Sequence, residues 1–134
     1  MHVSDRILIG DGVGEWVQQQ AGGFFRPGAQ CIGLRNARGE IIGGTIFDYC
    51  NGASVYLHGA ATGRLTREFI RTFMDYPFNQ LRVNVVICLV AAGNERSRRF
   101  VEHLGCTLHS SIPEADPSGS LLIYTMRKEQ CKWI

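Results

Sequence analysis

The sequence lacks any apolar run close to the roughly 20 residues that a membrane-spanning helix requires. Its first residues, Met-His-Val-Ser-Asp-Arg, have no signal-peptide character, so we expect no secretory leader. Charge is also scarce: charged residues make up 19% of the chain and the formal net charge is +2, which does not predict nucleic-acid binding. The 134 residues therefore predict one globular domain over residues 1–134, with no membrane partner.

Closely paired cysteines are missing as well. The five cysteines are an odd number, widely spaced and mostly embedded in apolar runs, and no Cys-x-x-Cys occurs. This usage predicts reduced, buried thiols and a cytoplasmic location rather than a disulfide framework. The one close His/Cys pair, His103 and Cys106, straddles a predicted helix end, so we expect no metal site.

Hydrophobic periodicity in the first half predicts a helix followed by three antiparallel strands. The helix runs over Asp11–Ala21 and is closed by Gly22 and Gly23. The glycines before and within it lack the Gly-x-Gly-x-x-Gly spacing of a nucleotide loop, so they are interpreted as turn residues. Apolar, β-branched runs predict the strands, over residues 31–34, 41–49 and 54–61.

The second half predicts two helices around a buried strand, then a closing strand pair. The first helix covers residues 66–76 and is stopped by Pro77. The continuous apolar run over residues 83–92 predicts a central strand covered on both faces. A further helix is expected over residues 96–104, capped by Gly105, and strands over 107–112 and 120–127 joined by a polar loop.

The segment after the buried strand is the most informative part of the chain. It reads Asn94-Glu95-Arg96-Ser97-Arg98-Arg99-Phe100-Val101-Glu102-His103-Leu104-Gly105-Cys106. A turn leading into a glycine-terminated helix offers free N–H groups, which favour anionic or carbonyl ligands. The segment resembles the strand–Asn-x-x-Ser-helix-Leu-Gly pattern of the GNAT N-acetyltransferase superfamily, closest to the branch that acetylates ribosomal-protein N-termini.

The resemblance covers roughly residues 31–127 and implies both a fold and a co-substrate. The fold class is α/β (α+β): a GNAT-like mixed, mostly antiparallel sheet with a splayed parallel strand pair at its centre and helices on both faces. The co-substrate is acetyl-CoA, which enters the cleft between the splayed strands, and no metal is needed.

The resemblance also implies where acetyl-CoA binds. In the family, the strand before the central helix holds the pantetheine arm, and the start of that helix binds the pyrophosphate. The positions that match here are Gly59, Ala60, Ala61, Gly63, Arg64, Leu65, Thr66, Arg67, Asn94 and Arg98. The family usually has Arg/Gln-x-x-Gly-x-Gly/Ala before this helix, and only one of those glycines is retained here. Gly63 either contributes to the cofactor loop or only allows a tight strand-to-helix turn. Asn94 contacts the cofactor, caps its helix, or does both.

Two residues are the candidate catalytic groups. Ser97 matches the serine of the Asn-x-x-Ser pattern, which implies that it protonates the leaving thiolate; the alternative is an ordinary first-turn residue. Many family members instead use a tyrosine seven positions after the asparagine, where this chain has Val101, which cannot donate a proton. His58 is the candidate base because imidazole changes charge near neutral pH, although it could be structural. Asp48, Tyr49 or a water molecule are alternatives to it.

The predicted function is an N-acetyltransferase that moves an acetyl group from acetyl-CoA to a primary amine. The acceptor is a small molecule or a peptide or protein N-terminus, which attacks directly in a ternary complex. The alternative is a catalytically degenerate GNAT-fold module for binding or regulation, and the arginine clusters are the sole support for chemistry on another acyl-CoA or a nucleic-acid base. We expect the acceptor pocket over residues 10–27 and 113–120. Residues 131–134 either meet a second copy in a homodimer or tuck onto their own domain.

Overall fold

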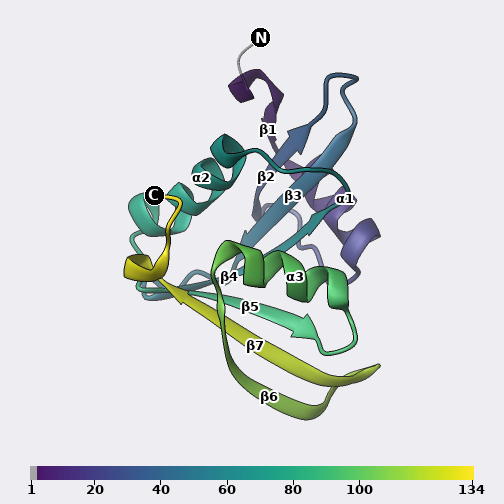
Figure 1. Cartoon of the computed structure of the whole chain (residues 1–134), viewed down its shortest axis with the longest axis vertical. Helices are drawn as coiled ribbons and strands as arrows, with labels where there is room; N and C mark the ends of the chain where they lie inside the picture. Colours follow the sequence, from purple (N-terminus) through teal and green to yellow (C-terminus); the bar gives the residue numbers. More distant parts are fainter. Residues whose placement is uncertain (1–2) are drawn as a thin grey trace.

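Within the described residues 3–134 of the computed structural model, seven strands form one sheet in the order β1-β2-β3-β4-β5-β7-β6 (Figure 1). Neighbouring strands run antiparallel except β4 and β5, which are parallel. The strands are β1 (Ile7–Ile9), β2 (Gln30–Arg35), β3 (Ile41–Asp48), β4 (Ser54–Ala61), β5 (Val85–Ala91), β7 (Gly119–Arg127) and β6 (Thr107–Asp116). The predicted fold class is confirmed.

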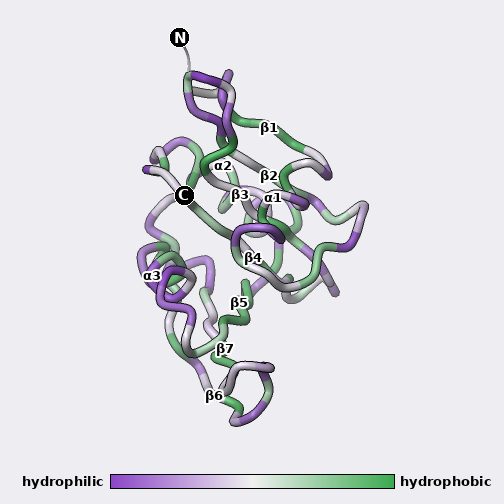
Figure 2. Tube along the Cα trace, turned by 90° about the vertical axis from the view of Figure 1, so that its right-hand side faces the viewer, coloured by the Kyte–Doolittle hydropathy of each residue, from purple (hydrophilic) through white to green (hydrophobic). Residues whose placement is uncertain are grey.

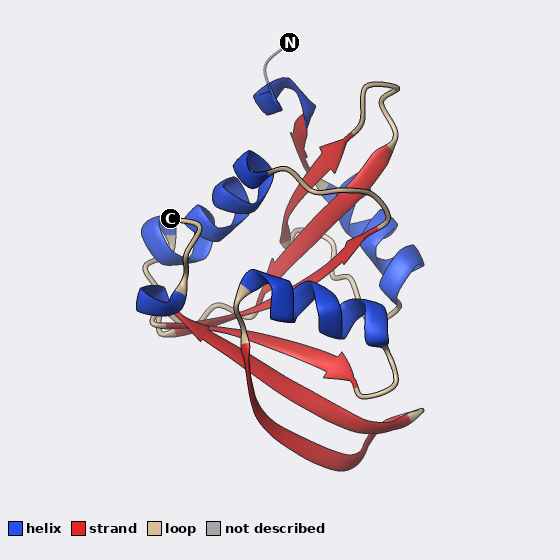
Figure 3. Ribbon diagram, in the orientation of Figure 1, coloured by secondary structure: helices blue, strands red, loops and turns tan. Residues whose placement is uncertain are grey.

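Helices cover both faces of the sheet (Figure 3). They are α1 (Asp11–Ala21), α2 (Arg67–Asp75) and α3 (Glu95–Leu104). Successive side chains of a strand point to opposite faces, and β3 shows this: Ile46 packs in the cluster under α1, whereas Phe47 packs in the larger cluster under α2 and α3. In Figure 2, β5 is mostly hydrophobic and α3 is hydrophilic over much of its length, as expected for a buried strand beneath an amphipathic surface helix.

Helix α1 lies unusually close to the sheet because the strands beneath it carry glycine. A Cβ at Gly33 would lie 2.7 Å from a methyl carbon of Val13, and one at Gly44 would lie 2.8 Å from a methyl carbon of Val17. Both valines are fully buried. This close packing fixes the C-terminal end of α1 beside the centre of the sheet, where the candidate site lies.

The parallel pair β4 and β5 is joined only at its start. Pairing covers Ser54 to Tyr56 on β4 and Val85 to Ile87 on β5, and beyond these residues the strands diverge. Gly59 lies on the diverging part of β4, where a Cβ would meet Phe100 of α3 at 2.9 Å. The divergence therefore opens a gap in the middle of the sheet, and α3 begins at its edge.

Pro77 does not end the helical segment, contrary to the prediction. The chain changes at Tyr76 into one π-helical turn, η2 (Tyr76–Gln80), closed by a 2.9 Å hydrogen bond from the Leu81 N–H to the Tyr76 carbonyl. Proline lacks the N–H that would continue the hydrogen-bond ladder of α2, and the α-helical pattern accordingly ends at Asp75. The buried side chains of Pro77 and Phe78 hold this turn against the core.

Two strands also differ from the prediction. Strand β5 is not covered on both faces: Val86, Cys88 and Val90 are buried, but Leu89 is 40% exposed because its face borders an open cavity. Strand β6 continues through Pro113 to Asp116, so the expected long loop shrinks to a tight hairpin turn. Pro113 lies where the register with β7 shifts, between Ile112 and Asp116, so no regular ladder hydrogen bond requires its missing N–H.

The C-terminal segment tucks onto its own domain. The Trp133 indole N–H donates to the Leu104 carbonyl at 2.9 Å, and its ring lies 5.7 Å from that of His103. Cys131 is buried beside the same core. Of the two alternatives for this segment, the structure favours packing within the chain.

Among the helices of residues 3–134, none is both long and apolar enough to cross a membrane.

Candidate active site

A cleft of about 630 Å³ lies where β4 and β5 diverge. Its walls come from the end of α1, the end of β4, the starts of α2 and α3, and the C-terminal segment. Its lining residues are Gln20, Ala21, Gly59, Ala60, Ala61, Gly63, Arg64, Leu65, Arg67, Ile70, Asn94, Arg96, Ser97, Arg99, Phe100, His103 and Trp133. The cleft thus brings together most of the predicted cofactor-binding residues with Ser97.

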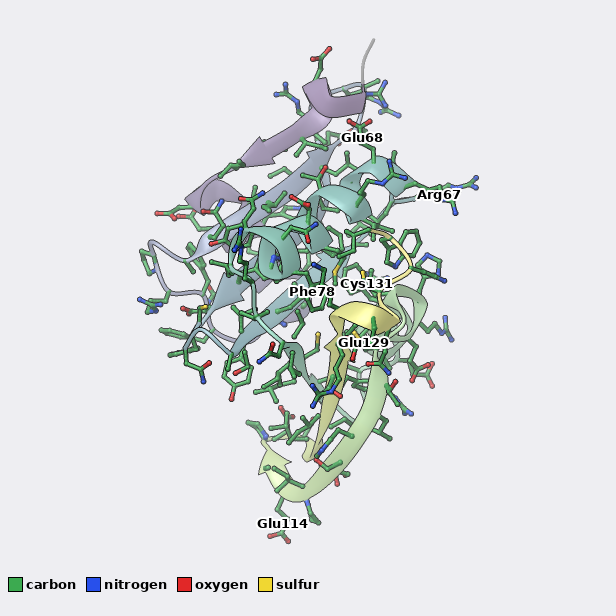
Figure 4. The ribbon with its side chains drawn as sticks, turned by 90° about the vertical axis from the view of Figure 1, so that its left-hand side faces the viewer. Arg67, Glu68, Phe78, Glu114, Glu129 and Cys131 are labelled. Carbon is green, nitrogen blue, oxygen red and sulfur yellow. The ribbon has the colours of Figure 1, made fainter. Side chains whose placement is uncertain are left out.

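The charged side chains of this cleft are cationic. Arg64 and Arg67 come from the loop and first turn before α2, and Arg96 and Arg99 come from the first turns of α3. Figure 4 shows Arg67 projecting from the start of α2. Among the described residues that line the cleft, no Asp or Glu occurs. Such a lining favours a phosphate-bearing ligand, because one guanidinium group can donate two parallel hydrogen bonds to the oxygens of a phosphate.

The loop before α2 uses part of its backbone for structure. The N–H groups of Thr62 and Gly63 both donate to the Ile42 carbonyl, at 2.9 and 3.3 Å. Gly63 does not adopt a positive φ, and a Cβ there would lie 3.2 Å from the Ile42 side chain, so its role is close approach. The Thr66 hydroxyl caps α2 by accepting from the Phe69 N–H at 3.1 Å. The N–H groups left for an anion are those at the start of α2.

Asn94 and Ser97 lie at the start of α3. The Asn94 side-chain oxygen accepts from the Ser97 N–H at 3.1 Å, so Asn94 is the N-cap of the helix. Among the described residues, no hydrogen-bond partner of the Ser97 hydroxyl is present. Both residues line the cationic cleft and also a second cavity, so they stand at the junction of the two.

The second cavity, of about 390 Å³, lies between the α1 side of the sheet and the β6–β7 hairpin. It is lined by Ala21, Gly23, Phe24, Ile46, Asp48, Tyr49, Tyr56, Leu57, His58, Leu89, Val90, Ala91, Asn94, Ser97, Asp116 and Leu121. Tyr56 and His58 share a face of β4, as the alternation of strand side chains predicts. The cavity draws on the two segments, near residues 10–27 and 113–120, where sequence reasoning expected the acceptor.

His58 is held by the glycine turn after α1. Its Nε2 lies 3.0 Å from the Gly22 carbonyl oxygen. A carbonyl can only accept, so in the neutral ring Nε2 carries the hydrogen and Nδ1 keeps the lone pair. Gly23 has φ +79°, and a Cβ there would lie 3.0 Å from the same Nε2, so the turn fits closely around the ring. The contact fixes which nitrogen can act as a base.

Of the predicted cofactor residues, Thr66 and Arg98 do not line the cleft. The Thr66 hydroxyl is used in the cap of α2, and the Arg98 guanidinium donates to the Ala92 carbonyl at 3.3 Å. Sequence reasoning noted the arginine cluster of α3 but assigned only Arg98 to the cofactor. It did not assign Arg96, Arg99 and His103, which share one face of α3 with Phe100. The spacing of three and four residues was a usable signal, because such positions neighbour one another on a helix. Val101, at the family's tyrosine position, is buried in the core.

The buried thiols line neither cavity. Burial raises the pKa of Cys31 to about 11, and its side chain packs under α1 rather than in either cavity. Four cysteines are buried and free, whereas Cys50, contrary to the expectation of buried thiols, is exposed. Within the described residues, no group of three or more His, Cys, Asp and Glu side chains could hold a metal ion.

An ion pair closes the outer edge of the second cavity. Two guanidinium nitrogens of Arg26, Nε and Nη2, donate to the Asp48 carboxylate, and the Nε to Oδ2 distance is 3.2 Å. The Asp48 side chain is only 12% exposed, and this pairing lowers its pKa. A lowered folded-state pKa means that the pair stabilises the fold above the ordinary carboxyl pKa of about 4 and that this stabilisation is lost as the pH falls through the lowered value.

Replacing Arg26 with glutamine should therefore reduce stability at neutral pH and have less effect in acid. We expect the difference in free energy of unfolding between the parent and Arg26→Gln to shrink as the pH falls from about 6 to about 2, measured by urea unfolding. Arg38→Gln is the matched control, because the Arg38–Glu40 pair is solvent-exposed with a 4.0 Å N–O distance. A difference that stays constant with pH would show that the pair does not act through the charge of Asp48.

Comparison with known proteins gives one family and one fold. Residues 14–107 match the family model described as an acetyltransferase (GNAT) domain. Among curated proteins, none matches the sequence.

Similar solved structures include the ribosomal-protein-S5-alanine acetyltransferase from Vibrio fischeri, with 12% identity, a TM-score of 0.63 and coverage of 78% of this chain and 64% of that one. A variant of the spermidine N-acetyltransferase from Vibrio cholerae has 16% identity, a TM-score of 0.63 and coverage of 78% and 68%. An acetyltransferase from T. thermophilus has 22% identity, a TM-score of 0.63 and coverage of 78% of this chain and 62% of that one. The chain thus spans less than two thirds of the first and third of these proteins, and at such identities the likeness shows the fold.

Proposed function

This chain belongs to the GNAT acetyltransferase family, and we propose that it transfers an acetyl group from acetyl-CoA to a primary amine that attacks directly in a ternary complex. The amine belongs to a small molecule or to a peptide or protein N-terminus. The observation that carries the proposal is the meeting of two cavities at Asn94 and Ser97. One cavity is lined by arginines and suits a phosphorylated donor, and the other is lined by carboxylates and rings and suits an amine.

The cationic cleft fits acetyl-CoA. Arg64, Arg67 and the start of α2 would hold the pyrophosphate, and Arg96 and Arg99 would lie along the same ligand. The gap that opens where β4 and β5 diverge would hold the extended arm, and Asn94 would orient that arm where it reaches α3. Acetyl-CoA supplies an activated acyl group and a thiolate that leaves when the amine has attacked.

The chain's own groups then handle two protons. An amine is mostly protonated near neutral pH and must lose a proton before it can attack, and His58 Nδ1 is the group that accepts it. The protonated ring still donates from Nε2 to the Gly22 carbonyl, so its position does not change on proton uptake. The Ser97 hydroxyl gives its proton to the leaving thiolate and takes up the second proton, which the nitrogen loses after its attack. The rest of the rate enhancement comes from the positioning of the two reactants by backbone groups and arginine side chains.

A thermal-shift titration with acetyl-CoA tests the donor site. We expect a saturable rise in Tm that is weak or absent with ATP, and ligand at a hundred times its Kd should add roughly 2.7 kcal/mol to the free energy of unfolding. Arg64→Ala should raise the Kd for acetyl-CoA about tenfold, because one phosphate contact is lost. Arg38→Ala, in the distant β2–β3 turn, should leave it unchanged.

The same titration separates the enzyme from the alternative of a degenerate module. Release of free thiol from acetyl-CoA in the presence of a primary amine should accompany binding. If millimolar acetyl-CoA gives no rise in Tm, the donor site is absent, and the fold serves as a binding or regulatory module instead.

A further inference from the structure

The two cavities have opposite electrostatic character. Four arginines line the cleft proposed for the donor: Arg64, Arg67, Arg96 and Arg99. Among the described residues that line the second cavity, the charged side chains are Asp48 and Asp116, and no Lys or Arg occurs. A ligand that enters the second cavity therefore meets carboxylates and, farther in, the junction at Ser97. The negative charge of this cavity favours a cationic ligand over a neutral or anionic one.

Aromatic rings strengthen the selection. The rings of Tyr49 and Tyr56 meet edge to face, with centroids 5.9 Å apart, and the side chains are 60% and 39% exposed. Phe24, also lining the cavity, is 71% exposed. The guanidinium carbon of Arg26 lies 5.6 Å from the centroid of the Tyr49 ring. The chain's own cation thus already uses one ring face, and a ligand cation can use the others.

The two carboxylates are not equivalent. Arg26 neutralises Asp48, whereas Asp116 forms no ion pair among the described residues. The partners of Asp116 are neutral: the Ser118 N–H and hydroxyl both donate to its Oδ2, at 3.0 and 2.5 Å. These bonds lower its pKa and keep it charged at neutral pH. Asp116 is half-buried at the rim of the cavity and carries the negative charge that a ligand can pair with.

We propose that the acceptor is a small aliphatic diamine or polyamine. Its reacting amine lies at the junction beside Asn94 and Ser97, and its second ammonium group lies against Asp116 and the tyrosine rings. The inference rests on the proposed function, because it names the acceptor of the same acetyl transfer. The 16% identity to a spermidine N-acetyltransferase shows a fold alone and leaves the acceptor open.

The reaction changes the charge of one end of the acceptor. After the ammonium group has given one proton to His58, the neutral nitrogen forms a bond to the acyl carbon and the carbon–sulfur bond breaks. The second proton, which the nitrogen loses after its attack, reaches the sulfur through the Ser97 hydroxyl. The products are an uncharged amide and the CoA thiol. The second ammonium group keeps its charge, so the product remains a monocation that binds the carboxylate-lined cavity more weakly than the dicationic substrate.

Direct binding tests the inference without requiring turnover. We would titrate 1,4-diaminobutane and butylamine, which differ in one ammonium group, into the full chain saturated with CoA, using calorimetry. The diamine should bind about tenfold more tightly, through one ion pair and one cation–π contact. Raising the salt concentration should reduce this ratio, because a half-exposed ion pair is screened. Equal affinities would overturn the proposal.

Two matched variants locate the second ammonium group. Asp116→Asn should reduce the ratio of diamine to butylamine affinity from about tenfold to about threefold, since it removes the ion pair, keeps the shape and leaves the cation–π contact. Glu114→Gln, at the turn end of the same hairpin but not in the cavity lining, should keep the parent ratio (Figure 4). An unchanged ratio in Asp116→Asn, or an equal loss in both variants, would overturn the assignment to Asp116.

Turnover with acetyl-CoA separates this inference from the proposed function. Thiol release with both amines at equal kcat/KM, or a preference for a neutral peptide N-terminus, would leave the acetyltransferase standing and overturn the diamine. Tight diamine binding with no thiol release would support a diamine-binding site but overturn both the acetyl transfer and the role of the diamine as its acceptor. A kcat/KM about tenfold higher for the diamine than for butylamine, mainly through a lower KM, supports both the acetyltransferase function and the diamine as its acceptor.

Discussion

Replacing Ser97 with alanine is expected to lower kcat for acetyl transfer by about 100-fold, because the leaving thiolate loses its proton donor. The hydroxyl lies where the two cavities meet and has no hydrogen-bond partner among the described residues, so it is available to a ligand atom. The Kd for acetyl-CoA should change by less than about twofold, because the loss is confined to the reacting state. Thiol-release kinetics and a thermal-shift titration measure the two quantities.

The control for this loss is Ser111→Ala, an exposed position on β6 outside both cavities. It should keep the parent kcat. A Ser97→Ala variant with full activity would show that solvent protonates the thiolate, and the serine would then be an ordinary first-turn residue of α3.

The largest effect on stability is expected at Phe73. Its side chain is 0% exposed, and its ring centroid lies 5.0 Å from that of Phe69 and 6.5 Å from that of Phe100. It therefore joins α2 to α3 above the sheet. Phe73→Ala should lower the free energy of unfolding by about 3–5 kcal/mol, through lost burial and the cavity left behind. Urea unfolding followed by circular dichroism gives the value.

The same chemical change at an exposed phenylalanine calibrates this prediction. Phe24→Ala, at a side chain that is 71% exposed, should cost less than about 0.5 kcal/mol. If Phe73→Ala does not fold, Phe73→Leu keeps most of the volume and should cost about 1 kcal/mol. Equal losses at the two phenylalanines would show that the contact between the helices is not a principal source of stability.

The elements that the sequence predicts well are those that one local signal defines. Apolar positions and the Thr66 cap define α2, and Asn94 and Gly105 define both ends of α3. The prediction was wrong where a non-local partner decides: β6 continues through Pro113 because it pairs with β7, and Pro77 lies within a π turn held against the core. Such partners leave no periodic trace in the sequence.

In the candidate site, too, local signals could be found in the sequence and non-local contacts could not. The cofactor-binding positions form nearly continuous segments around α2 and α3, so a sequence pattern can find them. The second cavity is assembled from α1, β3, β4, β5 and the β6–β7 hairpin. Its Asp116 lies far along the chain from Tyr49 and Phe24, and no spacing connects them. Arg98 shows the limit within one helix, since its neighbours Arg96 and Arg99 reach the cleft and it does not.

The divergence of β4 from β5 also leaves a sheet edge in the interior of the protein. Beyond Tyr56, β4 pairs with β3 on one side, and no strand of residues 3–134 pairs with it on the other. Every second peptide group over the rest of β4 must then bond to water or to a ligand. A ligand arm that contains amide groups, as pantetheine does, can occupy the place of the missing strand and bond to the same backbone groups. Recognition of that arm would then depend on the path of the backbone, and side-chain substitutions along β4 would affect it little.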